Sequence, residues 1–512
     1  MTGDRWSAPA RLARALALLA AFGFLASYLA VALLRIDFPF EIEWMEGGSR
    51  GHVARIVAGE ALYGPPTLAF TPFIYTPLYF HVGAWLSPVL GEGFLPLRLI
   101  SWLASLGVFA LVAAFVLRET RDRVAAVLAV GVFAATFRIS GAWFDIARVD
   151  SLFLLFTLAA LFPLRFGSGW RAGALAGVLG ACGFFTKQTA LPILGAFAIC
   201  ALVERNAKWV AFFAVFGGLA VLGSLALNLV SDGWFAYYAF ELPGQHRARW
   251  YKVGDFWWSS VLGRLPIVTA AAVAFFALER APGADSRRRF YAWLVIGTLG
   301  ASMFSRVHSG GYLNVLMPGY AGLAILFGLG VARLRGGSVA QRRPWIPLAV
   351  FALCLVQFGM LRYDVRRQIP RERDRLAGER LVEIIRGFEG EVLVPFHGYL
   401  PALAGKSRSG QWMAIADVLR GDEGELEQAL ELEIRYAILE QRFDAIIVDA
   451  EDWYPTELAS AYELSEELFE DRSTFRTRTG DRKRPEKVFV PRRAESRGGE
   501  RVRSFSPQSY SR

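Results

Sequence analysis

Three glutamates lie close together where the chain leaves its first long apolar run. Glu41, Glu43 and Glu46 fall within the stretch FEIEWMEGGSRGH, where two glycines and Arg50 follow them. Carboxylates this close repel one another, which suits a site that needs a proton acceptor or a cation ligand. The alternative is structural. Residues 46–60 have the apolar spacing of an amphipathic helix on a membrane surface, where Glu46 would favour the helix dipole and pair with Arg50.

A second charged group lies in the stretch SGAWFDIARVDSLF, at the start of another apolar run. Asp145, Arg148 and Asp150 would lie at the mouth of a membrane-spanning helix. Ionisable groups at membrane depth are costly and tend to be functional. As an alternative, Asp150 would cap the helix together with Ser151.

Further cations lie outside the strongly basic loops. Lys187, in the turn FFTKQTALP, would either bind a ligand or extend to the membrane surface. Arg247, Arg249 and Lys252 lie in an aromatic-rich loop, residues 234–258. A belt at the membrane interface explains many of the rings, but three cations there suit a phosphate group.

The elements that must position these residues are those of a membrane protein. Of the 512 residues, 54% are hydrophobic and 20% charged, and long apolar runs recur from about residue 12 to 362. The net charge of +10 comes from basic residues in short loops, which argues against a nucleic-acid partner. The three cysteines fall inside apolar segments, and the five histidines have no metal-ligand spacing. A divalent cation held by Glu43, Glu46 or Asp150 remains an open alternative.

The positive-inside rule sets the topology. Basic loops at 118–123, 204–208, 280–289 and 333–343 are predicted to be cytoplasmic. If residues 73–90 crossed the membrane, the basic loop at 118–123 would lie outside, against this rule. From Pro77 to Leu90 a helix reaches only about 21 Å, short of the roughly 30 Å hydrocarbon core, so we expect an interfacial helix there. About eleven spans remain, near 12–34, 96–117, 124–139, 151–166, 171–186, 189–203, 208–230, 256–279, 290–304, 312–333 and 344–362. All five histidines, His308 among them, then lie on the outer side.

The last 150 residues lack the long apolar runs and have an ordinary, charged composition. Apolar strands are predicted at 391–396 and 443–449, a helix at 423–442, and a third strand at 487–491. We therefore expect an all-α polytopic membrane domain (1–362), a small outer α/β domain (363–493) that covers the site or contacts the acceptor, and a Ser/Arg-rich disordered tail (494–512).

Taken in order, these motifs resemble the GT-C superfamily of membrane glycosyltransferases, which includes aminoarabinose transferases and protein O-mannosyltransferases. The resemblance covers roughly residues 38–335. It rests on the acidic stretch, on Gly-x-x-Leu-Tyr and Tyr-Thr-Pro-Leu-Tyr, and on Arg-Leu-Ile-Ser, Arg-Val-Asp, Phe-Thr-Lys-Gln and Gly-Gly-Tyr-Leu-Asn-Val-Leu-Met-Pro. The family's first-loop catalytic carboxylate usually lies in an Asp-Glu pair, which the first outer loop of this chain lacks. Glu46 is the best match and Glu43 the second, while Asp150 and Lys187 match a helix-mouth acid and a Thr-Lys turn.

The resemblance implies a lipid-phosphate-sugar-dependent hexosyl or pentosyl transferase. Its donor would be a polyprenyl phosphate sugar, and its acceptor a hydroxyl on a lipid, polysaccharide or protein. A carboxylate would take the acceptor's proton, and the displacement would invert the anomeric centre. The leaving phosphate would be stabilised by cations. The expected donor-binding residues are Arg148, Lys187, Arg247, Arg249, Lys252, Tyr75 and Tyr79, and Asp145, His308 and Asn314 are further outer-face candidates. The expected location is the bacterial inner membrane, with the site facing the periplasm. The alternatives are a multi-pass transporter or lipid flippase and a structural membrane subunit.

Overall fold

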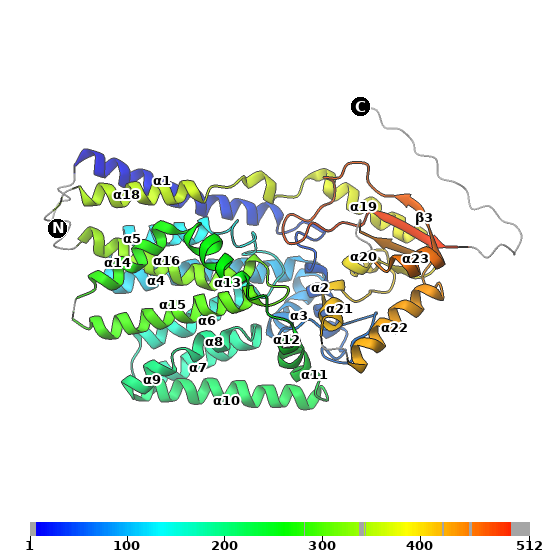
Figure 1. Ribbon diagram of the computed structural model, residues 1–512, viewed down its shortest axis with the longest axis horizontal. Helices are drawn as coiled ribbons and strands as arrows, with labels where there is room; N and C mark the ends of the chain where they lie inside the picture. Colours follow the sequence, from blue (N-terminus) through cyan, green and yellow to red (C-terminus); the bar gives the residue numbers. More distant parts are fainter. Residues whose placement is uncertain are drawn as a thin grey trace, which may run out of the picture.

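The computed structural model describes residues 7–280, 282–336, 343, 345–421, 424–449 and 453–492. The tail predicted at 494–512 lies outside the described residues. The chain forms a long helical bundle and a small domain with a β-sheet (Figure 1), which confirms the expected fold class. The principal bundle helices are α1 (Ala8–Arg35), α4 (Leu95–Thr120), α5 (Arg123–Ala135), α6 (Asp150–Phe166), α7 (Gly169–Thr186), α8 (Ala190–Gly195), α9 (Ala198–Glu204), α10 (Ala207–Val230), α14 (Pro266–Leu278), α15 (Ala284–Val307), α16 (Met317–Gly336) and α18 (Ile346–Met360).

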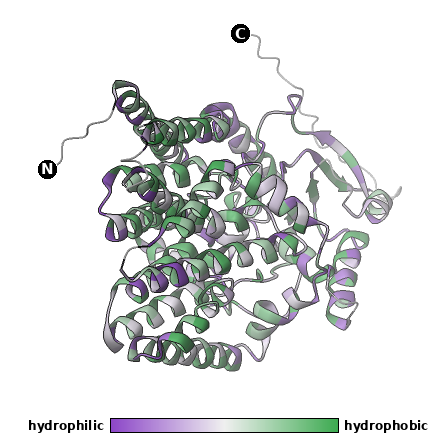
Figure 2. Ribbon diagram, turned by 60° about the vertical axis from the view of Figure 1, so that its left-hand side comes forward, coloured by the Kyte–Doolittle hydropathy of each residue, from purple (hydrophilic) through white to green (hydrophobic). Residues whose placement is uncertain are grey.

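The bundle helices pack side by side around α16. Helix α16 lies against α4, α5, α14, α15 and α18, and its side chains are buried along most of its length. Helices α1 and α10 lie at opposite edges of the bundle in Figure 1 and expose leucine, valine and phenylalanine side chains. An exposed apolar surface of this length suits contact with lipid chains. The apolar colouring of the bundle in Figure 2 contrasts with the more polar exposed helices of the C-terminal domain.

Each of the eleven expected spans contains helix, but they differ in length. Five helices among the described residues are long and apolar enough to cross a membrane, or up to seven spans if each of two bent pairs counts as one. The other expected spans form shorter helices, and the number of complete spans stays a prediction. Helix α3 (Leu78–Leu90) has 13 residues, which at about 1.5 Å per residue falls short of the hydrocarbon core.

The basic loops meet at one end of the bundle. Arg165 forms an ion pair with Glu119 across 2.5 Å, Arg335 lies 3.2 Å from Asp122, and Arg289 lies 3.3 Å from Glu204. The C-terminal domain lies at the opposite end (Figure 1). The loops predicted to be cytoplasmic thus lie together at the end of this multi-pass membrane protein that is far from the C-terminal domain.

Short elements build the end of the bundle that carries the acidic stretch. They are α2 (Glu46–Val57), α3, α11 (Trp234–Ala236), η1 (Tyr237–Glu241), α12 (Leu242–Gln245), α13 (Lys252–Asp255), η2 (Phe256–Leu262) and η3 (Leu313–Leu316). Helix α2 confirms that a helix follows the glutamates, but Glu46, Ser49 and His52 are among its buried residues and Val57 is exposed.

The C-terminal domain is a four-stranded sheet with helices around it. Its helices are η4 (Val365–Gln368), α19 (Glu372–Gly387), η5 (Pro395–His397), α20 (Leu400–Leu403), α21 (Trp412–Leu419), α22 (Glu425–Leu439) and α23 (Pro455–Ala461). The strand order is β1 (Val392–Leu393), β2 (Ala445–Val448), β4 (Lys487–Pro491) and β3 (Tyr462–Glu467), with β1 and β2 parallel and the other pairs antiparallel. The three predicted strands are present. Strand β3 was not predicted, because all but its first residue are exposed and it carries no apolar run.

The C-terminal domain packs directly on the acidic stretch. Phe40 and Trp44 share an apolar core with Phe396 and Tyr399. The Gln411 side-chain amide also donates to the Trp44 carbonyl across 2.8 Å. The two parts therefore form a joint surface around Glu41, Glu43 and Glu46.

Candidate active site

Five buried carboxylates from three segments meet beneath the C-terminal domain. Glu41 and Glu43 come from the segment between α1 and α2, Glu46 begins α2, and Asp145 and Asp150 come from the α5–α6 connection and the start of α6. Burying so many carboxylates is costly unless each is paired or protonated. Their partners therefore separate structural groups from a group that is available for chemistry.

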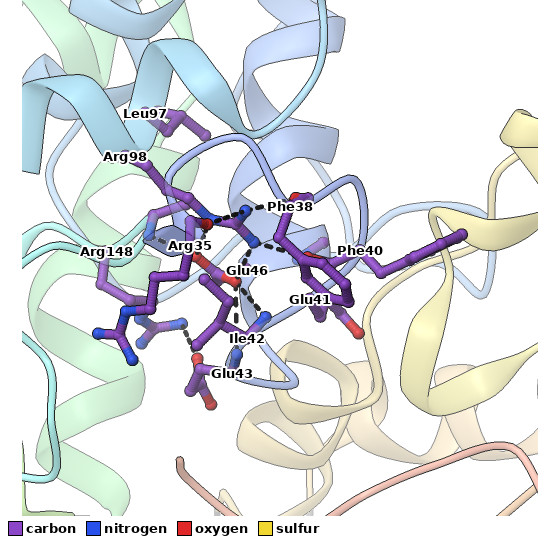
Figure 3. Close-up of polar contacts among 12 residues, drawn as sticks. Arg35, Phe38, Phe40, Glu41, Ile42, Glu43, Glu46, Leu97, Arg98 and Arg148 are labelled. Carbon is purple, nitrogen blue, oxygen red and sulfur yellow. Dashed lines mark hydrogen bonds and ion pairs between the residues drawn. The ribbon is translucent and has the colours of Figure 1, made fainter. Parts of the chain in front are cut away.

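Glu46 is a fully engaged structural carboxylate (Figure 3). It accepts from Arg98 Nε at 2.9 Å and Arg98 Nη2 at 2.7 Å, and from the Ile42 and Ala147 amides at 2.6 and 2.7 Å. Burial raises its pKa, but Arg98 and these amides outweigh burial and hold the pKa of Glu46 below its ordinary value. Its pairing is with Arg98, whereas Arg50 donates to the Glu92 carbonyl. This geometry gives Glu46 the task of tying the first outer loop to α4.

Asp145 and Glu41 are also paired. Asp145 accepts two hydrogen bonds from Arg35, at 2.6 and 2.7 Å. Glu41 lies 2.5 Å from His397 Nδ1 and accepts the Gly47 amide at 2.8 Å. Burial opposes protonation of His397, but Glu41 and the nearby Asp449 raise its pKa to about 10. Burial raises the pKa of Glu41 to about 7, although His397 opposes this shift. The Glu41–His397 contact thus links the acidic stretch to the C-terminal domain.

Asp150, the first residue of α6, accepts hydrogen bonds from three side chains. Its carboxylate accepts from Lys187 Nζ at 2.7 Å, from Asn314 Nδ2 at 3.0 Å and from Trp143 Nε1 at 2.9 Å. The expected cap with Ser151 is absent here, since the Ser151 hydroxyl donates to the Phe144 carbonyl. Asp150 therefore orients Lys187 rather than offering a free oxygen.

Glu43 differs from the other four. Both of its carboxylate oxygens are buried without a hydrogen-bond partner, and the nearest cation is Arg148, whose Nη1 lies 3.8 Å away (Figure 3). Burial raises the pKa of Glu43 to about 8, although Arg148 acts in the opposite direction. A buried carboxylate with a raised pKa and open lone pairs has the properties of a general base.

The C-terminal domain covers Glu43. The Arg478 and Thr479 amides donate to the Ile42 carbonyl at 2.8 and 3.2 Å. Next to them, Gly480 has a φ of 73°, and a Cβ there would lie 2.8 Å from a Glu43 oxygen. Glycine is therefore required for this close approach. An acceptor that reaches Glu43 must displace these three residues or enter beside them.

Arg148 lies between Glu43 and an open cavity of about 340 Å³. Its Nη2 donates to the Tyr75 hydroxyl at 3.0 Å, while Nε and Nη1 have no hydrogen-bond partner. The cavity is lined by Tyr75, Arg148, Lys187, His308 and Asn314 and by further polar and apolar residues, among them Asp417 and Met413. Unpaired guanidinium N–H groups beside an ammonium form a suitable site for an anion such as a phosphate.

Other expected donor-binding residues lie elsewhere. The Tyr79 hydroxyl is buried against the Leu97 carbonyl and Ser101 at 2.9 Å from each, so it packs α3 on α4. Arg247, Arg249 and Lys252 do not line the cavity, and the two arginines are exposed. The structure does not bring these four residues to the anion site.

Arg35, Arg98 and His397 are the residues that sequence reasoning missed. The available signal was an arginine at the end of one apolar segment and another inside a second one, since such residues are rare unless they have a buried partner. Among the described residues no group of three or more His, Cys, Asp or Glu side chains is placed to hold a metal ion.

Comparisons with known proteins bear on the fold. Neither a protein-family model nor a curated protein matches the chain. Among solved structures, apo ArnT from Cupriavidus metallidurans superposes with a TM-score of 0.56 at 13% identity, over 91% of this chain and 97% of that one. ArnT bound to undecaprenyl phosphate gives 0.53 at 13% identity, over 93% and 98%. The archaeal oligosaccharyltransferase AglB from Archaeoglobus fulgidus, in complex with an inhibitory peptide and a dolichol-phosphate, gives 0.51 at 11% identity, over 86% and 73%. At these identities the likeness concerns the fold, and the chain has the GT-C fold of membrane glycosyltransferases.

Proposed function

We propose that the protein transfers a sugar from a polyprenyl-phosphate-linked donor to an acceptor hydroxyl at the outer face of the membrane. The observation that carries the proposal is a buried carboxylate without hydrogen-bond partners, Glu43, at an open cavity beside the Arg148 guanidinium, whose Nε and Nη1 make no hydrogen bond. Two structures of the same fold support the donor class, because one holds undecaprenyl phosphate and the other a dolichol-phosphate.

The donor phosphate would lie against Arg148 and Lys187. As the bond between the anomeric carbon and the phosphate oxygen breaks, negative charge grows on the leaving phosphate. Two preorganised cations at the cavity would stabilise this charge. Asp150 keeps Lys187 in place for this role.

Glu43 would act as the general base. It takes the proton from the acceptor hydroxyl as that oxygen attacks the anomeric carbon. We prefer it to Glu46, whose lone pairs are already taken by Arg98 and backbone amides.

The carboxylate pairing also favours inversion. A retaining reaction needs a second carboxylate that is free to attack the anomeric carbon. Glu41, Glu46, Asp145 and Asp150 are each held by a cation. A single displacement with Glu43 as base therefore fits the site best.

A transfer assay tests the proposal. Purified protein in proteoliposomes is given radiolabelled hexose and pentose donors on polyprenyl phosphate, together with membrane-extracted acceptors. Removing the Arg148 charge by Arg148→Gln is expected to raise the KM for the donor about ten- to a hundredfold, because charge-assisted hydrogen bonds contribute about 1.5–3 kcal/mol.

Arg247→Gln is the matched control, because this exposed arginine lies outside the cavity. Its KM should stay within about twofold of wild type. Equal effects of the two substitutions would contradict the placement of the donor phosphate. If wild type transfers no sugar from any donor to any acceptor extract, the proposed function is wrong.

The role of Glu43 predicts a pH dependence. Burial raises the pKa of Glu43 to about 8; Arg148 opposes this shift, whereas Glu46 and Glu41 add to it. Only ionised Glu43 accepts a proton, so kcat/KM should rise about tenfold per pH unit below that pKa and level off above it. Initial rates from about pH 6 to 9 measure the profile, and a flat or falling profile would contradict the assignment of the base.

A further inference from the structure

A second cavity, of about 540 Å³, lies within the C-terminal domain. Helices α21, α22 and α23 surround it together with Phe396 of η5. Its volume falls within the range of about 300–1,000 Å³ that is typical of small-molecule sites. None of the groups assigned to sugar transfer lines it.

Three aromatic side chains form one wall of this cavity. The Trp412 ring meets Trp453 at 5.9 Å and 81°, and Tyr454 at 6.1 Å and 84°. The rings of Trp453 and Tyr454 lie 5.1 Å apart at 77°. Rings at right angles to one another leave ring faces in more than one direction for a ligand.

Polar groups also line the cavity, and the Arg435 guanidinium lies over the Tyr454 ring, 5.5 Å from its centroid. Arg435 forms ion pairs with both Glu431 and Glu457, so a guanidinium and two carboxylates lie side by side. Trp453 is 4% exposed, and its indole N–H has no hydrogen-bond partner within the described part of the chain. A buried donor left unpaired is destabilising, and a ligand that accepts a hydrogen bond from it would recover that cost.

The backbone at the aromatic wall is also unusual. Tyr454 has a φ of 43°, in the left-handed region that tyrosine rarely adopts. Strain of this kind is retained where the surrounding structure needs the side chain in one place. The Tyr454 ring is therefore held at the cavity at some cost to the local backbone.

We infer that this cavity binds a saccharide carried by the acceptor. A sugar ring has an apolar CH face that packs on aromatic rings, and hydroxyls that pair with carboxylate and guanidinium groups. Two carboxylates against one guanidinium disfavour a phosphate or other anion. These polar groups likewise disfavour an acyl chain.

The cavity lies next to the proposed reaction site, and helix α21 lines both. Trp412 and Leu419 of α21 line this cavity, whereas Met413 and Asp417 of the same helix line the cavity of Arg148. A row of rings continues from Trp412 through Phe396 to Trp44, the neighbour of Glu43, with centroid distances of 5.9 and 6.1 Å. The assignment of the bound saccharide to the acceptor rests on the proposed function, but the binding itself does not.

Binding of defined oligosaccharides tests the inference. Full-length protein in nanodiscs is titrated with maltohexaose, cellohexaose, chitohexaose, mannohexaose and xylohexaose, and binding is followed by saturation-transfer NMR and tryptophan fluorescence. At least one hexasaccharide should bind to wild type. Trp412→Leu, which keeps apolar bulk, should weaken that binding at least about tenfold.

Tyr454→Asn keeps the inference falsifiable if Trp412→Leu folds poorly. Asparagine tolerates the left-handed conformation, so this substitution removes the ring without adding backbone strain. It should also weaken binding at least about tenfold. The matched control is Tyr436→Ala, on the exposed face of α22 and 57% exposed. It should bind like wild type.

The outcomes separate this inference from the proposed function. The inference is overturned if the wild-type protein binds none of the five hexasaccharides. It is also overturned if Trp412→Leu and Tyr454→Asn both bind as tightly as wild type. Glu43→Gln should bind the saccharide normally while losing transfer. Saccharide binding by a wild-type protein that transfers no sugar would support the cavity assignment and refute the transferase.

Discussion

Glu43→Gln is expected to abolish nearly all sugar transfer while leaving the fold intact. Loss of a general base typically costs about 10²–10⁴-fold in rate. Stability should hardly change, because burial raises the pKa of Glu43 to about 8 and the side chain is then mostly neutral at pH 7. Glutamine has the same size and no charge. Single-turnover transfer with bound donor measures the chemical step, and thermal unfolding measures stability.

Glu92→Gln is the control for this experiment. Glu92 lies in the same first outer loop but is exposed, so the Glu92→Gln protein should transfer sugar at the wild-type rate. A Glu43→Gln protein that transfers within about threefold of wild type would remove Glu43 from the chemistry. Normal donor binding with lost transfer would place the defect in the reaction rather than in recognition.

Hydropathy and charge predicted much of the architecture. Apolar runs identified the helices of the bundle, and the basic loops identified the end at which they meet. The length of 73–90 predicted a helix too short to span, which matches α3. The number of complete spans stays a prediction, because several of the expected spans form short or bent helices among the described residues, such as α8, α9 and α14.

The state of each carboxylate could not be predicted. Their cations lie far away in the sequence: Arg98 is 52 residues from Glu46, Arg35 is 110 from Asp145 and His397 is 356 from Glu41. Local spacing contains no information on such pairs. It therefore identified the acidic group correctly as unusual, but it could not separate Glu43 from its paired neighbours.

The contacts of the C-terminal domain with the acidic stretch could not be predicted from the sequence either. Its strands followed from apolar runs, but its contacts with the acidic stretch come from backbone groups of 478–480 and from His397. Backbone hydrogen bonds across a domain boundary leave no side-chain pattern to detect. The fold thus places a separate domain over the proposed base.

Glu46→Gln is expected to fail through stability rather than catalysis. The substitution leaves the Arg98 guanidinium, which is 0% exposed, without its countercharge. Breaking one side of a buried ion pair costs about 3–5 kcal/mol, whereas replacing both sides by neutral groups is far less costly. The double substitution Glu46→Gln with Arg98→Met should therefore recover much of the lost thermal stability. It should also recover part of the transfer activity. The decisive opposite result is a Glu46→Gln protein that unfolds like wild type yet transfers no sugar, because that would return the role of base to Glu46 and leave Glu43 as a protonated packing group.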